Sequence, residues 1–172
     1  MGSRFRPEAL LEAVLFAAPE PIPLERLAEV LEMPLWECKQ VLSRYADALQ
    51  GLDRGIRLRQ VAGGWQLVTK PELLDAVARL AGQRKYKLSR PTIETLAIIA
   101  YRQPITRAEI EDIRGVKVEK ALATLLEKDL IREVGRKDTV GRPILYGTTD
   151  LFLEYFGLNS LDDLPTVGKL KL

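Results

Sequence analysis

The chain has 172 residues, 47% of them apolar and 29% charged, with 26 basic and 24 acidic side chains. This length suits one ordinary domain or two very small ones, and the composition argues against wholesale disorder. Because the sequence has no histidine and a single cysteine, Cys38, it excludes an intramolecular disulfide, a structural zinc site and Ser-His-Asp or Cys-His catalysis.

Neither a membrane span nor a secretion signal is expected. No uncharged apolar stretch approaches the roughly 20 residues of a membrane helix. No basic run followed by an apolar run precedes the first expected helix. We therefore expect a cytoplasmic protein without a membrane partner. The sequence offers no convincing pair of acid and base side chains and no cofactor motif, so we expect neither an enzyme nor a bound cofactor or metal.

One pattern occurs twice, 83 residues apart. Residues 12–22 align with residues 95–105, and in both an apolar helical stretch ends in a few turn residues and then a Pro-Ile pair. A second helix is expected directly after each pair, with apolar side chains at positions i and i+3. In the second copy, Thr106 and Glu109 have the spacing of a capping box, which fixes the start of that helix.

After each second helix the sequence predicts a third helix and a β-hairpin. Alternating apolar and polar residues and a Gly-Gly turn mark the first hairpin, and a long glycine-containing stretch joins the strands of the second. This is the order of a winged helix-turn-helix, so we expect an α+β, mainly α fold with two tandem winged helix-turn-helix domains. The expected segments are helix 34–49 with strands 56–61 and 65–69, and helix 118–128 with strands 130–134 and 144–148.

The two copies define the expected domains. We assign residues 6–82 to an N-terminal winged-helix domain and residues 90–158 to a C-terminal one, joined by the polar, basic linker 83–89. A short closing helix is expected to end at Gly157, since glycine often follows the last helical residue. Residues 159–172 are expected to form a mostly flexible tail.

Basic residues gather in the middle of the chain. Residues 83–149 carry 14 basic and 9 acidic side chains, whereas the regions before and after them are slightly acidic. If the second domain read DNA, its third helix would be the recognition helix, but the outward cations there are mostly lysines, which suit phosphate contact better than base readout. A tandem winged-helix transcription regulator that binds DNA is the alternative interpretation of the whole chain. The simpler interpretation of these cations is a helix face that water solvates. The four cations are Arg114, Lys117, Lys120 and Lys128.

The stretch 135–143 contains two glycines among basic residues, as phosphate-binding loops do. It lacks the Gly-Lys-Ser/Thr ending of a P-loop, and it precedes a strand where a P-loop precedes a helix. The wing of a winged helix explains its glycines and leaves its basic residues to contact phosphate or an acidic partner. Trp36, Trp65 and Cys38 are interpreted as packing residues, although an exposed tryptophan would instead mark an interface.

Several segments of the chain follow, in order and spacing, the pattern of one known family. They are residues 95–116, 135–136, 141–149 and 152–158 in the second copy and, more loosely, residues 12–16, 24–28 and 61–69 in the first. On these segments the chain resembles the segregation and condensation protein B (ScpB) family over about residues 7–165. It departs from the family at residues 138–140, where other members usually have a proline in the wing.

This resemblance implies a bacterial, non-enzymatic subunit of the chromosome condensation complex, associated with the nucleoid. It implies a homodimer formed mainly through the first domain. The kleisin ScpA, which bridges the heads of an SMC ATPase, would be held largely by the second domain, with help from the first domain of the other protomer. DNA would be contacted indirectly or weakly. A positive rim beside the groove between third helix and wing would suit an acidic-flanked ScpA segment. We assign this ScpA-binding rim to Arg102, Arg136, Lys137, Arg142 and Tyr146.

Overall fold

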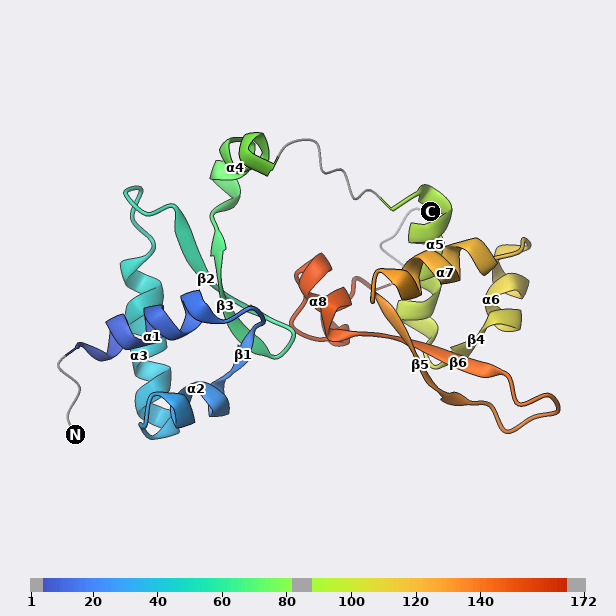
Figure 1. The fold of residues 1–172 in the computed structure, drawn as a ribbon, viewed down its shortest axis with the longest axis horizontal. Helices are drawn as coiled ribbons and strands as arrows, with labels where there is room; N and C mark the ends of the chain where they lie inside the picture. The colour runs from blue at the N-terminus through green and yellow to red at the C-terminus, as the bar shows by residue number, and fades with distance from the viewer. Residues whose placement is uncertain (1–4, 82–87, 167–172) are drawn as a thin grey trace. The chain divides into compact units, whose positions relative to one another are not determined.

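The computed structural model describes residues 5–81 and 88–166, and the chain divides into two compact units, residues 1–84 and 85–172. Figure 1 shows that each unit combines several helices with a small antiparallel sheet. More of the described residues lie in helices than in strands. The fold is therefore α+β and mainly α, as the sequence predicts.

Unit 1 has three helices, a three-stranded sheet and a further helix after the sheet. The sheet order is β1-β3-β2 and both pairings are antiparallel, with Ile22 opposite Trp65 and Leu58 opposite Leu67. The elements are α1 (Pro7–Ala17), β1 (Ile22–Pro23), α2 (Leu24–Val30), α3 (Leu35–Ala48), β2 (Ile56–Val61), β3 (Gly64–Thr69), the 3-10 turn η1 (Pro71–Leu73) and α4 (Leu74–Ala81).

Helices α1, α2 and α3 close over the apolar core of unit 1. Leu11, Leu27, Cys38 and Val41 are fully buried there, because apolar residues recur at helical spacing on the inner faces of these helices. Trp65 of β3 is half-buried and packs against the same core. Burial raises the pKa of the Cys38 thiol. The predicted packing roles of Cys38 and Trp65 are confirmed.

Unit 2 repeats this arrangement and ends in a short extra helix. Its sheet order is β4-β6-β5, again antiparallel, and its core holds Leu96, Ile99, Ile110, Leu125 and Ile131. The elements are α5 (Arg90–Arg102), β4 (Ile105–Thr106), α6 (Arg107–Arg114), α7 (Glu119–Glu127), β5 (Ile131–Arg136), β6 (Ile144–Thr148), α8 (Asp150–Phe156) and the 3-10 turn η2 (Leu161–Asp163).

The repeat seen in the sequence is a repeat of structure. Helices α1 and α5, strands β1 and β4, and helices α2 and α6 each begin 83 residues apart. In both units a third helix and a two-stranded ribbon follow, and the short first strand pairs with the second strand of the ribbon. Each unit thus has the helix order and the winged ribbon of a winged helix-turn-helix.

Two details of the hairpins differ from the expectation. The turn of the first hairpin consists of Ala62 and Gly63, both with positive φ as two-residue hairpin turns require, so Gly64 belongs to β3. Strand β5 continues to Arg136, beyond the expected end at residue 134. It does so because a β-bulge lets the pairing skip Val134.

Two helical features of unit 1 affect its surface. Leu35 is 43% exposed, because it is the first residue of α3, nearly one turn before the buried Cys38. Helix α4 follows the sheet over a stretch for which the sequence analysis predicted no element.

Residues 159–166, expected to belong to a flexible tail, are part of unit 2. Turn η2 has a capping box built on Ser160, and Leu164 packs against the core. The hydroxyl of Tyr101, on α5, donates a 2.6 Å hydrogen bond to the carbonyl of Pro165. These contacts hold this stretch against α5.

The rest of that tail, residues 167–172, and the linker residues 83–87 lie outside the described residues. Of the expected linker, Leu88 is buried in the core of unit 2 and Ser89 caps α5 by accepting a hydrogen bond from the backbone N–H of Thr92. Across residues 5–81 and 88–166, no helix has both the length and the apolar character needed to span a bilayer.

Candidate partner-binding site

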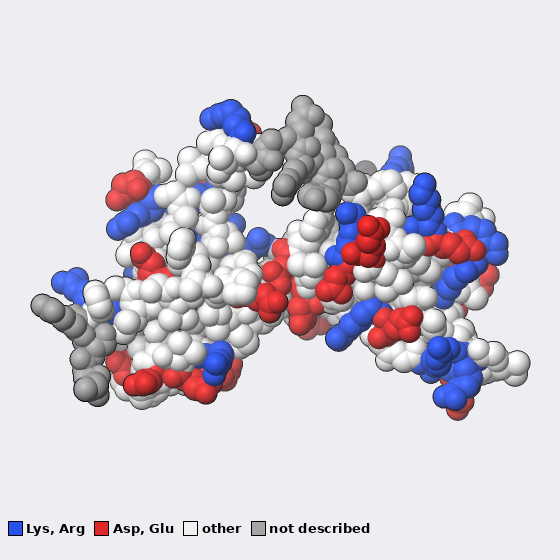
Figure 2. Space-filling view, viewed as in Figure 1, with Lys and Arg blue, Asp and Glu red and all other residues white. Residues whose placement is uncertain are grey.

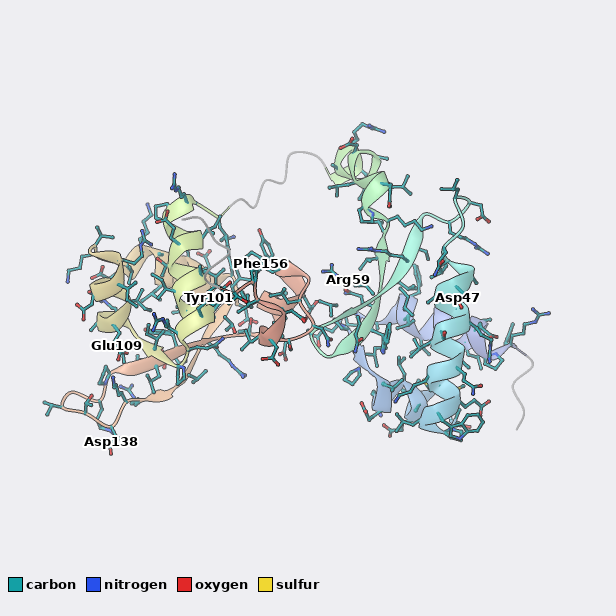
Figure 3. All side chains as sticks on the ribbon, turned by 180° about the vertical axis from the view of Figure 1, so that it is seen from behind. Asp47, Arg59, Tyr101, Glu109, Asp138 and Phe156 are labelled. Carbon is teal, nitrogen blue, oxygen red and sulfur yellow. The ribbon has the colours of Figure 1, made fainter. Side chains whose placement is uncertain are left out.

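The wing of unit 2 is tied to the start of α6. The ammonium of Lys137 lies 2.5 Å from Glu109 Oε1. Glu109 Oε2 accepts hydrogen bonds from the N–H and the hydroxyl of Thr106, at 2.9 and 2.7 Å, and the Glu109 N–H donates to Thr106 Oγ1. The predicted capping box is therefore present. Figure 3 shows Glu109 on α6 and Asp138 in the wing loop.

The negative charge of Glu109 is stabilised by these donors. The hydrogen bond from Lys137, and then those from Thr106, lower the pKa of Glu109 from 4.5 to about 2. The Lys137 and Glu109 side chains are 43% and 41% exposed, so water screens the pair and its contribution to stability is small. Lys137 is already paired with a carboxylate and offers a partner less charge than its place in the sequence suggests.

Arg136 and Arg142 flank the wing loop and are exposed. Arg136 Nη1 donates a 3.2 Å hydrogen bond to the carbonyl of Arg142, and the Lys137 N–H donates to the carbonyl of Pro143 at 2.9 Å. Among the described residues, no carboxylate lies within 4.0 Å of either guanidinium. Figure 2 shows basic side chains gathered over this wing, as a positive rim requires.

Arg102 lies beside a hollow that differs from the groove expected between third helix and wing. The hollow, about 390 Å³, lies between the turn that joins α5 to β4 and helix α6. Its lining includes Arg102, the carboxylates of Glu109 and Asp112, and Ile113, whose side chain is 55% exposed. Because Glu109 both lines the hollow and binds Lys137, the hollow and the wing meet at this carboxylate.

Tyr146 lies in the core, not on the rim where we expected it. Its side chain is 9% exposed, and burial raises the pKa of its phenol. In the sheet Tyr146 is directly opposite Ile105, which is also buried, and directly paired residues share one face of a sheet. The ring therefore points inward and supports the rim only through packing.

Arg114, one of the four cations of the possible DNA-reading surface, is directed into unit 2. Its guanidinium donates 2.7 Å hydrogen bonds to the carbonyl of Pro91 and to Thr95 Oγ1, and it lies 3.0 Å from a carboxylate oxygen of Glu94. The Arg114 side chain is only 14% exposed. It connects α6 to the first turns of α5 and does not face outward as the sequence analysis expected.

The other cations of that surface are mostly paired. Lys117 lies 3.4 Å from Glu111, and Lys128 also has an interaction partner. Lys120 is exposed on α7 directly after Glu119, which pairs with Arg107 on α6. A helix surface with this mixture of charges fits backbone phosphates poorly and disfavours the DNA-reading interpretation.

Unit 1 exposes apolar side chains that the sequence analysis did not single out as exposed. Trp36, expected to pack, is 62% exposed on α3, and Phe16 is 84% exposed on α1. Helix α4 presents Leu74, Val77 and Leu80 to solvent, with exposed fractions of 62%, 37% and 91%. Their spacing of three residues along α4 gives a continuous apolar stripe, a signal that could have identified this helix in the sequence.

A second hollow, of about 530 Å³, lies beside this part of unit 1. Leucines line it together with Arg54, Arg57 and Lys70, and the Lys70 ammonium donates a 2.7 Å hydrogen bond to the carbonyl of Gly51.

Nowhere in the part of the chain that the structure describes do three or more His, Cys, Asp or Glu side chains form a group suited to a metal ion.

Comparison with known proteins gives one consistent match. Residues 9–167 match the family described as segregation and condensation complex subunit ScpB. Segregation and condensation protein B of Symbiobacterium thermophilum is 50% identical over 158 residues, 92% of this chain and 72% of the relative. The protein of the same name from Carboxydothermus hydrogenoformans is 49% identical over 161 residues, 94% of this chain and 87% of the relative.

Solved structures of ScpB proteins are also similar in sequence. ScpB from Mycobacterium tuberculosis is 37% identical, with 91% of this chain and 99% of that chain covered and a TM-score of 0.43. A dimer of an ScpB N-terminal domain complexed with an ScpA peptide is 34% identical, with 42% and 91% covered and a TM-score of 0.41. The family match spans nearly the whole chain and both units, and the chain belongs to the segregation and condensation protein B family.

Proposed function

We propose that this chain is a non-enzymatic, homodimeric subunit of a bacterial chromosome segregation and condensation complex. In this proposal it binds the kleisin ScpA and through ScpA regulates the SMC ATPase. The observation that carries the proposal is the match of residues 9–167 to a family of complex subunits. ScpA is the proposed partner because an ScpB N-terminal domain has been found as a dimer with an ScpA peptide.

The exposed apolar side chains of unit 1 support dimerisation through this unit. A stripe such as that of Leu74, Val77 and Leu80 on α4 is seldom left in water on a soluble protein. Trp36 is a large apolar side chain of the kind enriched in interface cores. A second copy of unit 1 would cover these side chains, and in this proposal unit 1 is the dimerisation domain.

The positive rim and the hollow of unit 2 support ScpA binding there. In this proposal unit 1 of the other protomer also contacts ScpA, in keeping with the ScpA peptide found with the N-terminal domain of a relative. Arg102, Arg136 and Arg142 offer positive charge without a carboxylate partner among the described residues, and Ile113 offers an exposed apolar anchor point beside Arg102. An ScpA segment with acidic residues next to an apolar anchor would match this surface. In this proposal Lys137 contributes little, because Glu109 holds its ammonium.

The charge pattern of α7 supports an indirect role at DNA. Its neighbourhood combines paired lysines and carboxylates, so this helix has little net positive charge to offer to phosphates. The chain would therefore reach the nucleoid in the cytoplasm through its protein partners. Direct reading of base edges is not part of the proposed function.

Light scattering coupled to size-exclusion chromatography tests the proposal. The full chain alone is expected to have the mass of two copies, and adding ScpA from the same genome is expected to give a larger, stable complex. Duplex DNA titrated at about 50 and 200 mM salt is expected to bind weakly at both. A monomer with no ScpA complex, or tight and steeply salt-dependent DNA binding, would contradict the proposal.

A pair of variants locates the dimer contact. Leu80→Glu places a charge in the apolar stripe of α4 and is expected to give monomers. Val140→Glu introduces the same charge at the fully exposed tip of the wing and is expected to leave the dimer mass unchanged. If both variants stay dimeric, the dimer contact does not involve α4.

A further inference from the structure

The last helix of unit 2, α8, has an apolar face that none of the functions above uses. Leu151, Tyr155 and Phe156 are 41%, 53% and 45% exposed. Leu151 and Tyr155 are one helical turn apart, and the ring centroids of Tyr155 and Phe156 are 5.1 Å apart. The three side chains therefore form one continuous surface, which we call the α8 face.

The α8 face is held in place by the core beneath it. Phe152 is buried in the core one turn before Phe156, on the same side of α8, and the two ring centroids lie 4.9 Å apart. Thr149 caps the start of α8 by accepting a hydrogen bond from the Phe152 N–H, and Gly157 ends the helix in the left-handed conformation. A face fixed in this way loses little conformational freedom on binding, which favours affinity.

Acidic side chains lie beside the α8 face and in the segment that follows it. Asp150 and Glu154 are one turn apart on α8, Asp162 lies in η2, and residues 150–166 contain no Lys or Arg. Figure 2 shows acidic side chains at the position where Figure 1 draws α8. An apolar aromatic surface with an acidic rim complements a segment that carries lysine or arginine beside aliphatic or aromatic anchors. Aromatic rings also attract such cations directly.

Strand β6 separates this acidic surface from the basic wing. The wing loop precedes β6 and α8 follows it, so the two surfaces are about 17 Å apart along a strand of five residues. Unit 2 therefore presents opposite charges at the two ends of one strand. A partner that spans both ends must itself change sign along its length.

We propose that the α8 face docks a basic segment of ScpA, separate from the acidic-flanked segment that meets the wing. This inference rests on the proposed function, since it takes ScpA as the occupant. The basic side chains of that segment lie against Asp150 and Glu154, and its apolar side chains cover Leu151 and Tyr155. The two docked segments fix the direction in which ScpA crosses unit 2, because only one direction pairs both charges.

Calorimetric titration of the full chain with full-length ScpA tests this inference. The variant Leu151→Ala/Tyr155→Ala, in which both exposed anchors are truncated, is expected to bind ScpA at least about fivefold more weakly. The matched control is Leu126→Ala, a partly exposed apolar residue of α7, which is expected to bind within about twofold of the unchanged chain. Circular dichroism and thermal melting of each variant confirm that unit 2 is folded.

Charge reversal gives an independent readout. Asp150→Lys/Glu154→Lys is expected to weaken ScpA binding and to reduce its salt dependence, because the docked segment is basic. Stronger binding after this reversal would overturn the inference.

The remaining outcomes are also decisive. An affinity within about twofold of the unchanged chain for Leu151→Ala/Tyr155→Ala would overturn the inference and leave the proposed function standing. A loss of dimer mass in that variant would show that a second copy of the chain covers the α8 face, and would overturn it as well. If the unchanged chain does not bind ScpA, the proposed function itself fails.

Discussion

Lys137 and Glu109, which are 28 residues apart in the sequence, form a 2.5 Å ion pair between the wing loop and the first turn of α6. Glu109 is also the third residue of α6, and its carboxylate accepts a hydrogen bond from the backbone N–H of Thr106 in the capping box. A single side chain therefore contributes both to the start of a helix and to the position of the wing. The pairing of β5 with β6 holds the wing as well.

The stability of unit 2 is expected to fall in acid through Glu109. The pKa of this carboxyl is about 2 in the folded chain against an ordinary value of 4.5, so its contribution is complete above pH 4.5 and is lost as the pH falls towards 2. Glu109→Gln removes the charge while keeping an acceptor for the capping box. Urea unfolding at pH 7 and at pH 3 is expected to show a smaller acid loss for Glu109→Gln than for the unchanged chain.

The loss of unfolding free energy at pH 7 distinguishes the contribution of the ion pair from that of the capping box. Because the pair is about two-fifths exposed, Glu109→Gln is expected to cost under about 1 kcal/mol. Glu109→Ala, which also removes the cap acceptor, is expected to cost about 1 kcal/mol more. Equal stabilities of Glu109→Gln and Glu109→Ala at pH 7 would show that the side-chain acceptor at residue 109 contributes nothing to the capping box.

Replacement of Arg114 is expected to destabilise unit 2 without affecting any binding surface. Arg114→Met keeps the apolar stem but removes the hydrogen bonds to Pro91 and Thr95, at a cost of about 1.5–3 kcal/mol in the free energy of unfolding. Arg90→Met is the matched control, since Arg90 pairs with the same Glu94 but its side chain is 92% exposed. Its expected cost is under about 0.5 kcal/mol. Similar melting temperatures for the two variants would contradict this prediction.

Gly64 is expected to tolerate no side chain. A Cβ at this position would lie 2.7 Å from the carbonyl carbon of Pro21 and 2.9 Å from backbone atoms of Ile22, so β3 would have to move away from β1. Gly64→Ala is expected to destabilise unit 1 by about 1–3 kcal/mol in urea unfolding. In Gly55→Ala the added methyl meets only the end of the Leu73 side chain, at 3.3 Å, and a small change is expected. If the Gly64→Ala chain were as stable as the Gly55→Ala chain, β3 would not approach the backbone of Pro21 and Ile22 as closely as the structure shows.

The features predicted from sequence are those with a local or periodic cause. The capping box of Thr106 and Glu109 and the end of α8 at Gly157 appear as expected, because each depends on residues within a few positions of one another. The 83-residue repeat also appears as expected, because both copies carry the same periodic pattern. The α+β fold class followed from the order of these elements. Helix α4 has the same kind of periodic signal and was missed, because it has no counterpart in the repeat.

Side-chain partners across the fold could not be predicted from the sequence. Arg114 bonds to Thr95 across 19 residues, and Lys137 to Glu109 across 28, so no local pattern records either contact. Tyr146 was placed on the rim because it follows the basic wing, whereas its pairing with Ile105 turns it inward. In each case the sequence identified a residue of the correct region but not the neighbour that determines its role.

Of the rim residues, Arg142 is the one whose charge is expected to matter most for ScpA. Lys137 is paired with Glu109 and Arg136 also supports the wing loop, whereas no interaction ties the Arg142 side chain within the described residues. Arg142→Glu is expected to weaken ScpA binding by about tenfold in calorimetry at low salt, and Arg136→Glu/Arg142→Glu by more. Neither variant is expected to unfold unit 2.

Lys120→Glu makes the same charge change on α7 and serves as the control. Since Lys120 neither lines the hollow nor belongs to the rim, its variant is expected to bind ScpA as the unchanged chain does. If Arg142→Glu and Lys120→Glu weaken binding equally, ScpA responds to the net charge of unit 2 and not to the rim. If Arg142→Glu binds with unchanged affinity, Arg142 does not belong to the ScpA-binding site.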